Sequence, residues 1–155
     1  MRKRLEDIFC DVPVLERVHW DPKRYLNKVT ADSRNVRSGD VFVACPGTRM
    51  DGHDFLGQAM HDKAGVVVYE NEPDIMIPSH VTGVKVPDSR TALALLLNRY
   101  YDRPDQKVRL IGVTGTNGKT TTAYLIYRLL REHVKTAYLG TLWYELPSGR
   151  KTSVN

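Results

Sequence analysis

Residues 112–121 of this 155-residue chain read G-V-T-G-T-N-G-K-T-T, a glycine-rich run that ends in a lysine and two threonines. Glycine lets a backbone turn tightly and bring its N–H groups against phosphate oxygens. The Lys119 ammonium can then reach the terminal phosphates, and the Thr120 hydroxyl has the position that normally ligates Mg²⁺. The run therefore predicts a site for the phosphates of a nucleotide, with ATP as the expected ligand.

The spacing of this run departs from the pattern G-x-x-x-x-G-K-[ST] at one position. The residue five before Gly118 is Val113 rather than glycine. A glycine-rich turn that binds no ligand is the alternative interpretation. The context favours phosphate binding, because an apolar run precedes the loop, a helical pattern follows it, and a helix N-terminus attracts anions.

A strand and a helix must position this loop. The apolar run 108–113 predicts a buried strand, and residues 119–132 predict a helix that starts at the lysine. Residues 135–140 predict a second strand, which would complete a β-α-β unit, and residues 144–151 predict a hairpin. Because such a unit cannot cover both faces of a parallel sheet, we expect residues 108–155 to be the beginning of a domain that further chain or a partner completes.

Ahead of this segment, the sequence predicts a separate α/β domain with a parallel sheet. Its expected elements alternate: strands at 28–31, 40–44, 65–69 and 81–86, a helix around 55–64, and a helix from Asp88 or Ser89 to about Tyr101. Residues 5–17 predict a short helix that leads into a connector. Pro104 lies in a polar segment at 102–107, which we take as the domain boundary. The predicted domains are therefore 1–103 and 108–155.

Composition limits the classes of partner. Hydrophobic residues make up 41% of the chain and charged residues 26%, which is typical of a folded globular protein. The net charge is +5, but the basic residues do not cluster, so neither nucleic acid nor a membrane is an expected partner. The chain has no long apolar run, and its start, M-R-K-R-L-E-D, carries acids where a signal peptide needs its apolar segment, so we expect a cytoplasmic protein. Cys10 and Cys45 are isolated in sequence, and we expect both to be buried and reduced.

The stretch 114–122, T-G-T-N-G-K-T-T-T, resembles the ATP loop of the Mur ligases, the ATP-dependent amide-forming enzymes of peptidoglycan synthesis. Ahead of it, Asp32-Ser33-Arg34, the run G-D-V-F-V-A at 39–44 and D-G-H-D-F at 51–55 resemble the N-terminal UDP-binding domain of that family. The resemblance covers residues 25–155, which is only the front of the family's three-domain architecture. Within the family, the loop and the following L-G-T most resemble the MurE type, which adds the third amino acid. The MurF type shares D-S-R and D-G-H and is the alternative.

The resemblance implies roles for particular residues. Those implied to contact the UDP-sugar substrate are Ala31, through its backbone, Ser33, Thr48, Arg49, Met50 and Asn155. Those implied to bind ATP are Gly115, Thr116, Asn117, Gly118, Lys119, Thr120 and Thr121. Lys119 would be the catalytic residue, since it would stabilise charge on the transferring phosphoryl group, and Thr120 would ligate Mg²⁺.

Simpler roles stay open for three of the polar residues. The Ser33 hydroxyl can stabilise its own turn by bonding to the backbone. His53, in the loop before Asp54 and Phe55, is more typical of a structural histidine than of an acid-base group. Asp32 can pair with Arg34 or Arg37, and we assign it no catalytic role.

In a complete enzyme, the resemblance implies addition of lysine or meso-diaminopimelate to UDP-N-acetylmuramoyl-L-alanyl-D-glutamate. The substrate carboxylate would attack the γ-phosphate of ATP, and the amine of the amino acid would then displace phosphate from the resulting acyl phosphate. We expect the chain alone to be inactive, because most of the family's catalytic domain is missing from it. Two other classes stay open: a non-catalytic UDP-sugar-binding module folded from residues 1–103, and a small-molecule kinase that uses the same loop. For a kinase, neither an acceptor base nor a lid is identifiable.

Overall fold

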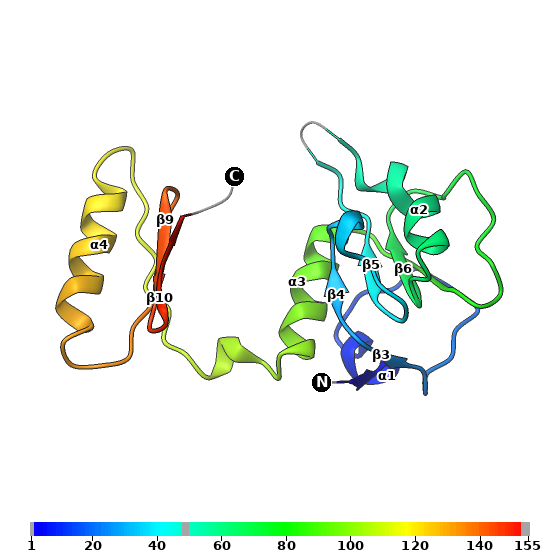
Figure 1. The fold of residues 1–155 in the computed structure, drawn as a ribbon, viewed down its shortest axis with the longest axis horizontal. Helices are drawn as coiled ribbons and strands as arrows, with labels where there is room; N and C mark the ends of the chain where they lie inside the picture. The colour runs from blue at the N-terminus through cyan, green and yellow to red at the C-terminus, as the bar shows by residue number, and fades with distance from the viewer. Residues whose placement is uncertain (1, 48–49, 153–155) are drawn as a thin grey trace. The chain divides into compact units, whose positions relative to one another are not determined.

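The computed structural model describes residues 2–47 and 50–152. It divides into two compact units, Met1–Val108 and Arg109–Asn155, which we treat as separate bodies (Figure 1). Most of the buried hydrophobic side chains belong to the first unit. Across the described residues, no helix has the length and apolar character needed to span a membrane.

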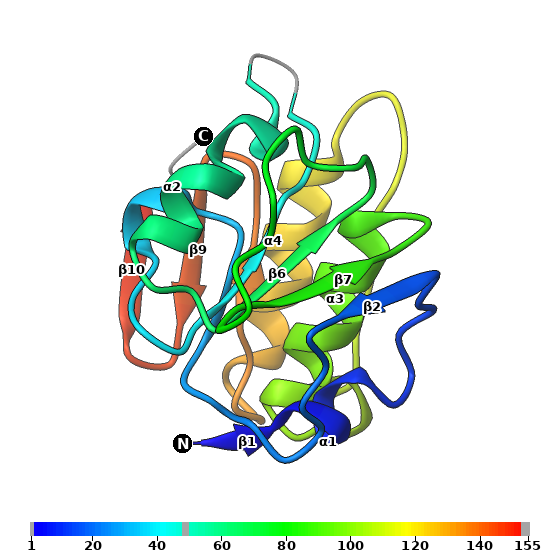
Figure 2. The same cartoon turned by 90° about the vertical axis from the view of Figure 1, so that its right-hand side faces the viewer.

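The first unit is built on a five-stranded sheet in the order β2-β7-β6-β5-β4. Its parallel strands are β4 (Val29–Thr30), β5 (Val41–Val43), β6 (Val66–Tyr69) and β7 (Thr82–Lys85). The edge strand β2 (Glu16–Val18) runs antiparallel to β7, and Figure 2 shows β2, β7 and β6 side by side. A separate antiparallel pair joins β1 (Lys3–Arg4) to β3 (Tyr25–Leu26). Because β4 to β7 are parallel, their carboxyl ends lie along one edge of the sheet.

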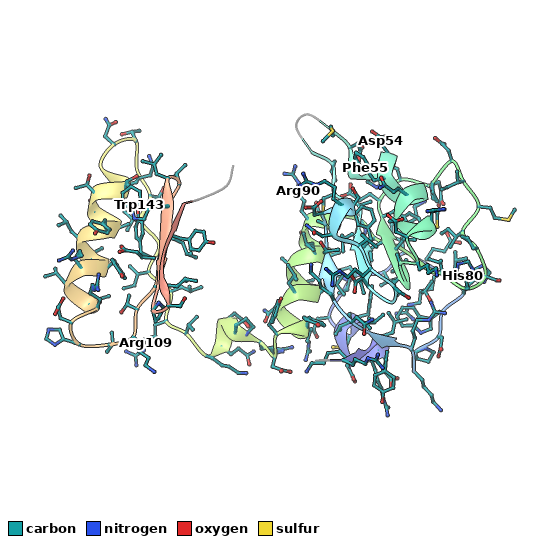
Figure 3. The ribbon with its side chains drawn as sticks, in the orientation of Figure 1. Asp54, Phe55, His80, Arg90, Arg109 and Trp143 are labelled. Atoms are coloured by element: carbon teal, nitrogen blue, oxygen red, sulfur yellow. The ribbon has the colours of Figure 1, made fainter. Side chains whose placement is uncertain are left out.

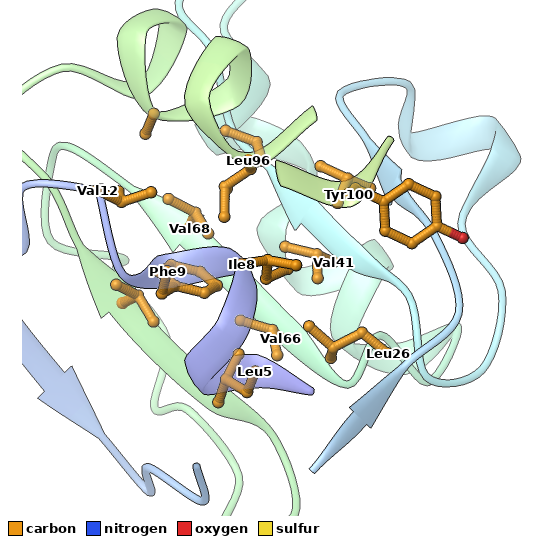
Figure 4. Close-up of a cluster of buried hydrophobic side chains, with 14 of the residues drawn as sticks. Leu5, Ile8, Phe9, Val12, Leu26, Val41, Val66, Val68, Leu96 and Tyr100 are labelled. Carbon is orange, nitrogen blue, oxygen red and sulfur yellow. The ribbon is translucent and has the colours of Figure 1, made fainter. Parts of the chain in front are cut away.

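Helices cover both faces of this sheet: α1 (Leu5–Phe9) and α3 (Ser89–Tyr100) pack on one face, and α2 (Leu56–His61) packs on the other. Successive side chains of a strand point to opposite faces, so Val41 and Val43 join the core with α1 and α3, whereas Phe42 joins the core with α2. Figure 4 shows the first of these cores. Burial on both faces explains why β5 and β6 are continuous apolar runs in the sequence. The predicted α/β class is confirmed.

Short 3₁₀ helices lie in the connections: η1 (Ser33–Asn35), η2 (Gly52–Phe55) and η3 (Pro104–Gln106). The α3 helix begins at the predicted position, because the Asp88 side chain accepts a hydrogen bond from the Thr91 N–H at 2.5 Å. That N-cap satisfies one of the backbone donors that a helix start leaves without an internal partner.

The second unit contains α4 (Lys119–Leu130) and an antiparallel sheet in the order β10-β9-β8, formed by β8 (Tyr138–Leu139), β9 (Trp143–Leu146) and β10 (Gly149–Thr152). Aromatic rings join the helix to the sheet. The ring centroids of Tyr127 and Tyr138 are 5.9 Å apart, and those of Tyr124 and Trp143 are 5.8 Å apart. The predicted helix and hairpin of this unit are thus confirmed, and they pack through a small aromatic core.

The strand predicted at 108–113 is wrong. Its apolar side chains are exposed, with exposed fractions of 57% for Val108, 80% for Leu110 and 62% for Ile111. A strand needs neighbours for its backbone N–H and C=O groups, and the described strands of this unit pair with one another instead. The strand predicted at 135–140 shortens to β8, which pairs antiparallel with β9. The β-α-β unit is therefore absent from the described residues, because the nearby hairpin offers local pairing that needs no crossover.

Three expectations near the N-terminus are also corrected. The helix predicted at 5–17 ends at Phe9, because Pro13 lacks a backbone N–H and disfavours helical geometry at the residue before it. The stretch that follows contains β2 and β3, which have only three and two residues and are too short to show an apolar alternation. Cys10 is exposed rather than buried, since it follows α1 at the surface, where its Sγ donates to the Asp7 carbonyl at 3.2 Å. Both cysteines are free thiols, as expected.

Candidate functional site

The loop predicted to bind phosphate leads directly into α4. Gly115 has φ +147° and Gly118 has φ +75°, backbone conformations that other residues rarely adopt. Gly118 is the N-cap of α4, and no side chain caps the helix there. The N–H groups of the first helical turn, which have no partner inside the helix, therefore face away from it toward an incoming ligand. With the helix dipole, they favour an anion such as phosphate.

Lys119 folds back over this loop. Its Nζ donates hydrogen bonds to the carbonyl oxygens of Gly115 and of Thr116, the latter at 3.1 Å. These bonds place the ammonium against the loop, beside the uncapped helix start.

Thr120 follows as the second residue of α4, and it is exposed, as are Thr116, Asn117 and Thr121. Among the described residues, no group of three or more His, Cys, Asp or Glu side chains is arranged to hold a metal ion. Mg²⁺ at a nucleotide site takes only one or two protein ligands and completes its shell with phosphates and water. A single threonine hydroxyl at the helix start fits that pattern.

The residues implied to bind the sugar nucleotide follow β4 and β5, at the carboxyl edge of the parallel sheet. Open α/β sheets bind their ligands at this edge. Ala31 is exposed, and Ser33 is half-buried at the start of η1. The structure thus brings these two residues to the edge at which a ligand is expected.

Asp32, not Ser33, stabilises the turn between β4 and β5. Its Oδ1 accepts hydrogen bonds from the backbone N–H of Arg34 at 3.1 Å and from Arg34 Nε at 2.9 Å. Asp32 therefore pairs with Arg34 rather than with Arg37. The hydrogen bond from the Arg34 side chain is the main reason that the pKa of the Asp32 carboxyl is lowered to about 2. Because Asp32 already caps the turn, the Ser33 hydroxyl is not needed there and is available to a ligand.

Of the other residues implied to contact the substrate, Met50 is described, and it follows β5. Met50 has an exposed fraction of 67%, and its carbonyl accepts from the Gly47 N–H at 3.1 Å. An antiparallel bridge between Pro46 and Asp51 closes the base of the loop. The backbone at Gly52 lies so near the backbone of Cys45 that a Cβ on Gly52 would be 2.6 Å from it. Thr48, Arg49 and Asn155 lie outside the described residues.

Sequence reasoning missed a hydrogen-bonded network beside this loop. His53 Nδ1 lies 2.6 Å from Asp51 Oδ1, and its Nε2 accepts from the Glu70 N–H at 3.0 Å. Glu70 Oε1 in turn accepts from the N–H of Ser89 at 2.6 Å and from its hydroxyl at 2.7 Å. The network links the loop after β5, the end of β6 and the start of α3. The preference for a structural His53 agrees with this geometry.

Arg90 ties α3 to the same loop, because its guanidinium donates to the Pro46 carbonyl at 2.7 Å. Figure 3 shows Arg90, Asp54 and Phe55 at one end of the first unit and His80 at the other. The start of α3 is already bonded to the carboxylates of Asp88 and Glu70. A phosphate there would have to displace a protein carboxylate, so the α3 N-terminus is a poorer anion site than the α4 N-terminus.

Comparison with known proteins matches both units to one family. Residues 26–101 match the Mur ligase family, catalytic domain, and residues 113–155 match the Mur ligase middle domain. A UDP-N-acetylmuramoyl-L-alanyl-D-glutamate--2,6-diaminopimelate ligase from Syntrophomonas wolfei is 45% identical over 121 residues, which cover 77% of this chain and 24% of that protein. A UDP-N-acetylmuramyl-tripeptide synthetase from Borreliella afzelii is 36% identical over 154 residues, which cover 96% of this chain and 30% of that protein.

Solved structures agree with these matches. A structure of UDP-N-acetylmuramoyl-L-alanyl-D-glutamate--2,6-diaminopimelate ligase has a TM-score of 0.70 at 25% identity and covers 95% of this chain and 29% of its own. A MurF ligase from Thermotoga maritima, solved in complex with ADP, has a TM-score of 0.52 at 33% identity and covers 69% of this chain and 24% of its own. The chain therefore spans only about a quarter to a third of the length of the relatives that it matches. From its two family matches and its T-G-T-N-G-K-T-T-T loop, the chain belongs to the Mur ligase family.

Proposed function

We propose that this chain supplies the sugar-nucleotide site and the ATP phosphate loop of a ligase that adds the third amino acid to UDP-N-acetylmuramoyl-L-alanyl-D-glutamate. The observation that carries the proposal is the uncapped start of α4, where Lys119 lies against the loop 115–118. The names of the similar relatives support the choice of reaction. Several of these are 2,6-diaminopimelate ligases, which favours diaminopimelate over lysine as the amino acid. Because ATP is a cytoplasmic substrate, the proposal places the protein in the cytoplasm.

The two units would have separate tasks. In the first, Ala31, Ser33 and the loop around Met50 would hold the uridine diphosphate end of the substrate at the carboxyl edge of the sheet. Remote binding of this kind positions a distant reacting group, here the carboxylate that attacks ATP. In the second, the loop N–H groups and Lys119 would bind the β- and γ-phosphates and stabilise the charge that develops on the transferring phosphoryl group. Mg²⁺, held through Thr120, would neutralise phosphate charge.

A non-catalytic sugar-nucleotide module is the second candidate for the chain as it stands. The observation that favours it is the largely exposed run 108–113, since the described residues of the second unit include no strand of the kind that normally supports a phosphate loop from behind. The first unit, by contrast, has a complete two-sided core. The two candidates differ in one property, the binding of ATP.

Isothermal titration of the 155-residue chain separates the candidates. We expect binding of UDP-N-acetylmuramoyl-L-alanyl-D-glutamate and, in the presence of Mg²⁺, of ATP. Binding of the sugar nucleotide alone would support the module. Binding of ATP alone would contradict the role given to the first unit, and binding of neither would contradict the proposed function as a whole.

A further inference from the structure

We propose that His53 is a positioning residue that holds the two described ends of the loop after β5, at Pro46 and at Met50–Asp51, in the arrangement that binds the sugar nucleotide. This inference rests on the proposed function of the first unit. It adds to that function a residue that touches no substrate and acts through Asp51 and the backbone of β6.

The partners of His53 fix its tautomer. The backbone N–H of His53, and then its ring, lower the pKa of the Asp51 carboxyl, so that carboxyl is ionised at neutral pH and only accepts hydrogen bonds. Nδ1, at 2.6 Å from Asp51 Oδ1, must therefore carry the ring hydrogen. On the other side, the backbone N–H groups of Glu70 at 3.0 Å and Asn71 at 3.4 Å are donors only, so Nε2 must be the acceptor.

This arrangement leaves His53 no free nitrogen for proton transfer. Both ring nitrogens are engaged, and only 12% of the side chain is exposed. An acid-base role would require one of these bonds to break in every turnover. The geometry therefore points to a structural link between two strand ends.

The hydrogen bond from His53 holds the Asp51 end of the loop after β5, and Arg90 holds the Pro46 end. Asp51 pairs with Pro46 across the base of the loop, and Arg90 holds the Pro46 carbonyl at 2.7 Å. The exposed Met50 lies between these anchors. Loop ends that are held in place before binding lose less conformational freedom when the ligand arrives, so the anchors raise affinity without touching the ligand. Loss of the His53 anchor releases the Asp51 side of the loop from the end of β6.

The tautomer is measured first, in the unmodified 155-residue chain. Two-bond ¹H–¹⁵N spectra of ¹⁵N-labelled histidine distinguish a protonated Nδ1 from a protonated Nε2. We expect His53 to show a protonated Nδ1 and a bare Nε2, whereas His61, whose side chain is 90% exposed, serves as the reference for a weakly held ring. A protonated Nε2 on His53 would overturn the proposal, because the bond from the Glu70 N–H could not exist.

Binding is measured next, with the variant His53→Phe and the matched control His61→Phe. Phenylalanine keeps the ring volume and removes the hydrogen bonds of both ring nitrogens. We expect the Kd of His53→Phe for UDP-N-acetylmuramoyl-L-alanyl-D-glutamate to rise roughly two- to tenfold, the effect of about one net hydrogen bond. Its Kd for ATP, and both Kd values of His61→Phe, should stay within about twofold of the parent.

Amide hydrogen exchange shows whether the variant remains folded. We expect faster exchange at the Glu70 N–H in His53→Phe and unchanged exchange in the core strand β5. A folded His53→Phe chain that binds the sugar nucleotide as tightly as the parent would overturn the role of His53 alone. A parent chain that binds no sugar nucleotide would instead overturn the proposed function, and this inference with it. A global loss of protection in His53→Phe would make the histidine a general fold determinant and would also contradict a role confined to the loop.

Discussion

Replacing Glu70 with alanine tests the network that joins β6 to α3. Glu70 Oε1 is the acceptor for both the N–H and the hydroxyl of Ser89, at 2.6 and 2.7 Å. Ser89 is fully buried, so removal of the Glu70 side chain leaves both of its donors without a protein acceptor. The hydroxyl can rotate, whereas the direction of the backbone N–H is fixed, so the cost falls mainly on the backbone N–H.

The expected magnitude follows from that one donor. A buried donor left without a partner costs about 1–3 kcal/mol, so we expect the free energy of unfolding of the first unit to fall by that amount in Glu70→Ala. Urea denaturation followed by Trp20 fluorescence, in a Trp143→Phe background, reports on this unit, because Trp20 packs against its core and lies 5.6 Å from the Phe9 ring.

Two matched variants control for the loss of a charge and of side-chain volume. Glu72→Ala removes a neighbouring carboxylate whose side chain is 61% exposed and which pairs with Lys85, so it should cost less than about 1 kcal/mol. Glu70→Gln keeps an oxygen acceptor and should lose less stability than Glu70→Ala. A Glu70→Ala chain no less stable than Glu72→Ala would refute the account of the network.

Three further outcomes follow from the first unit. Leu96→Ala, at a fully buried position of the core with α1 and α3, should lower the free energy of unfolding by about 2–5 kcal/mol in urea denaturation, and a loss below about 1 kcal/mol would contradict the assigned packing. Pairing with Arg34 lowers the pKa of the Asp32 carboxyl from 3.8 to about 2. The stabilisation from this pairing is therefore fully present above the pKa of the unfolded state, 3.8, and is lost as the pH falls through the pKa of the folded state, about 2. A ¹³C NMR titration midpoint near 4 would rule this out. Ser33→Ala should weaken binding of UDP-N-acetylmuramoyl-L-alanyl-D-glutamate roughly two- to tenfold in calorimetry and leave ATP affinity unchanged, whereas an unaltered sugar-nucleotide Kd would remove Ser33 from the site.

The parallel strands could be predicted from the sequence because their environment is uniform. Residues 41–43 and 66–69 are apolar at every position, and each side chain is buried on one face or the other of the sheet. The start of α3 could also be predicted from the sequence, since Asp88 is an N-cap whose hydrogen-bond partner lies three residues away. Local chemistry was sufficient in both cases.

The run 108–113 is also mostly apolar, but it does not form a strand. Whether an apolar run becomes a strand depends on the neighbours that can pair with it, and the described residues of the second unit supply none. Its sequence alone carries no information on that point. The short strands β2 and β3 are the converse case, since their pairing with β7 and β1 is decided by position in the fold.

In the candidate site, too, the features encoded in contiguous residues were predictable and the contacts between distant residues were not. The phosphate loop, the turn at Ser33 and the loop at Met50 could be located from contiguous motifs. The bond from Glu70 to Ser89 could not, because it joins residues 19 positions apart that meet only when β6 and β7 are neighbours. For the same reason, the contact from Arg90 to Pro46, 44 positions apart, has no sequence signal.

The central claim, that this chain supplies the phosphate loop of a Mur ligase reaction, is tested most directly through Lys119. The measurement is phosphate release by the Syntrophomonas wolfei ligase after this chain replaces the matching quarter of its sequence, with Lys119 or with alanine at that position. Loss of a preorganised charge at the transferring phosphoryl group costs about 3–4 kcal/mol, so we predict that Lys119→Ala lowers turnover roughly a hundred- to a thousandfold while the Kd for the sugar nucleotide stays unchanged. Turnover of the alanine variant within about threefold of the unmodified chimaera would contradict the account, because a lysine that merely occupies the start of a helix can be replaced by alanine at little cost.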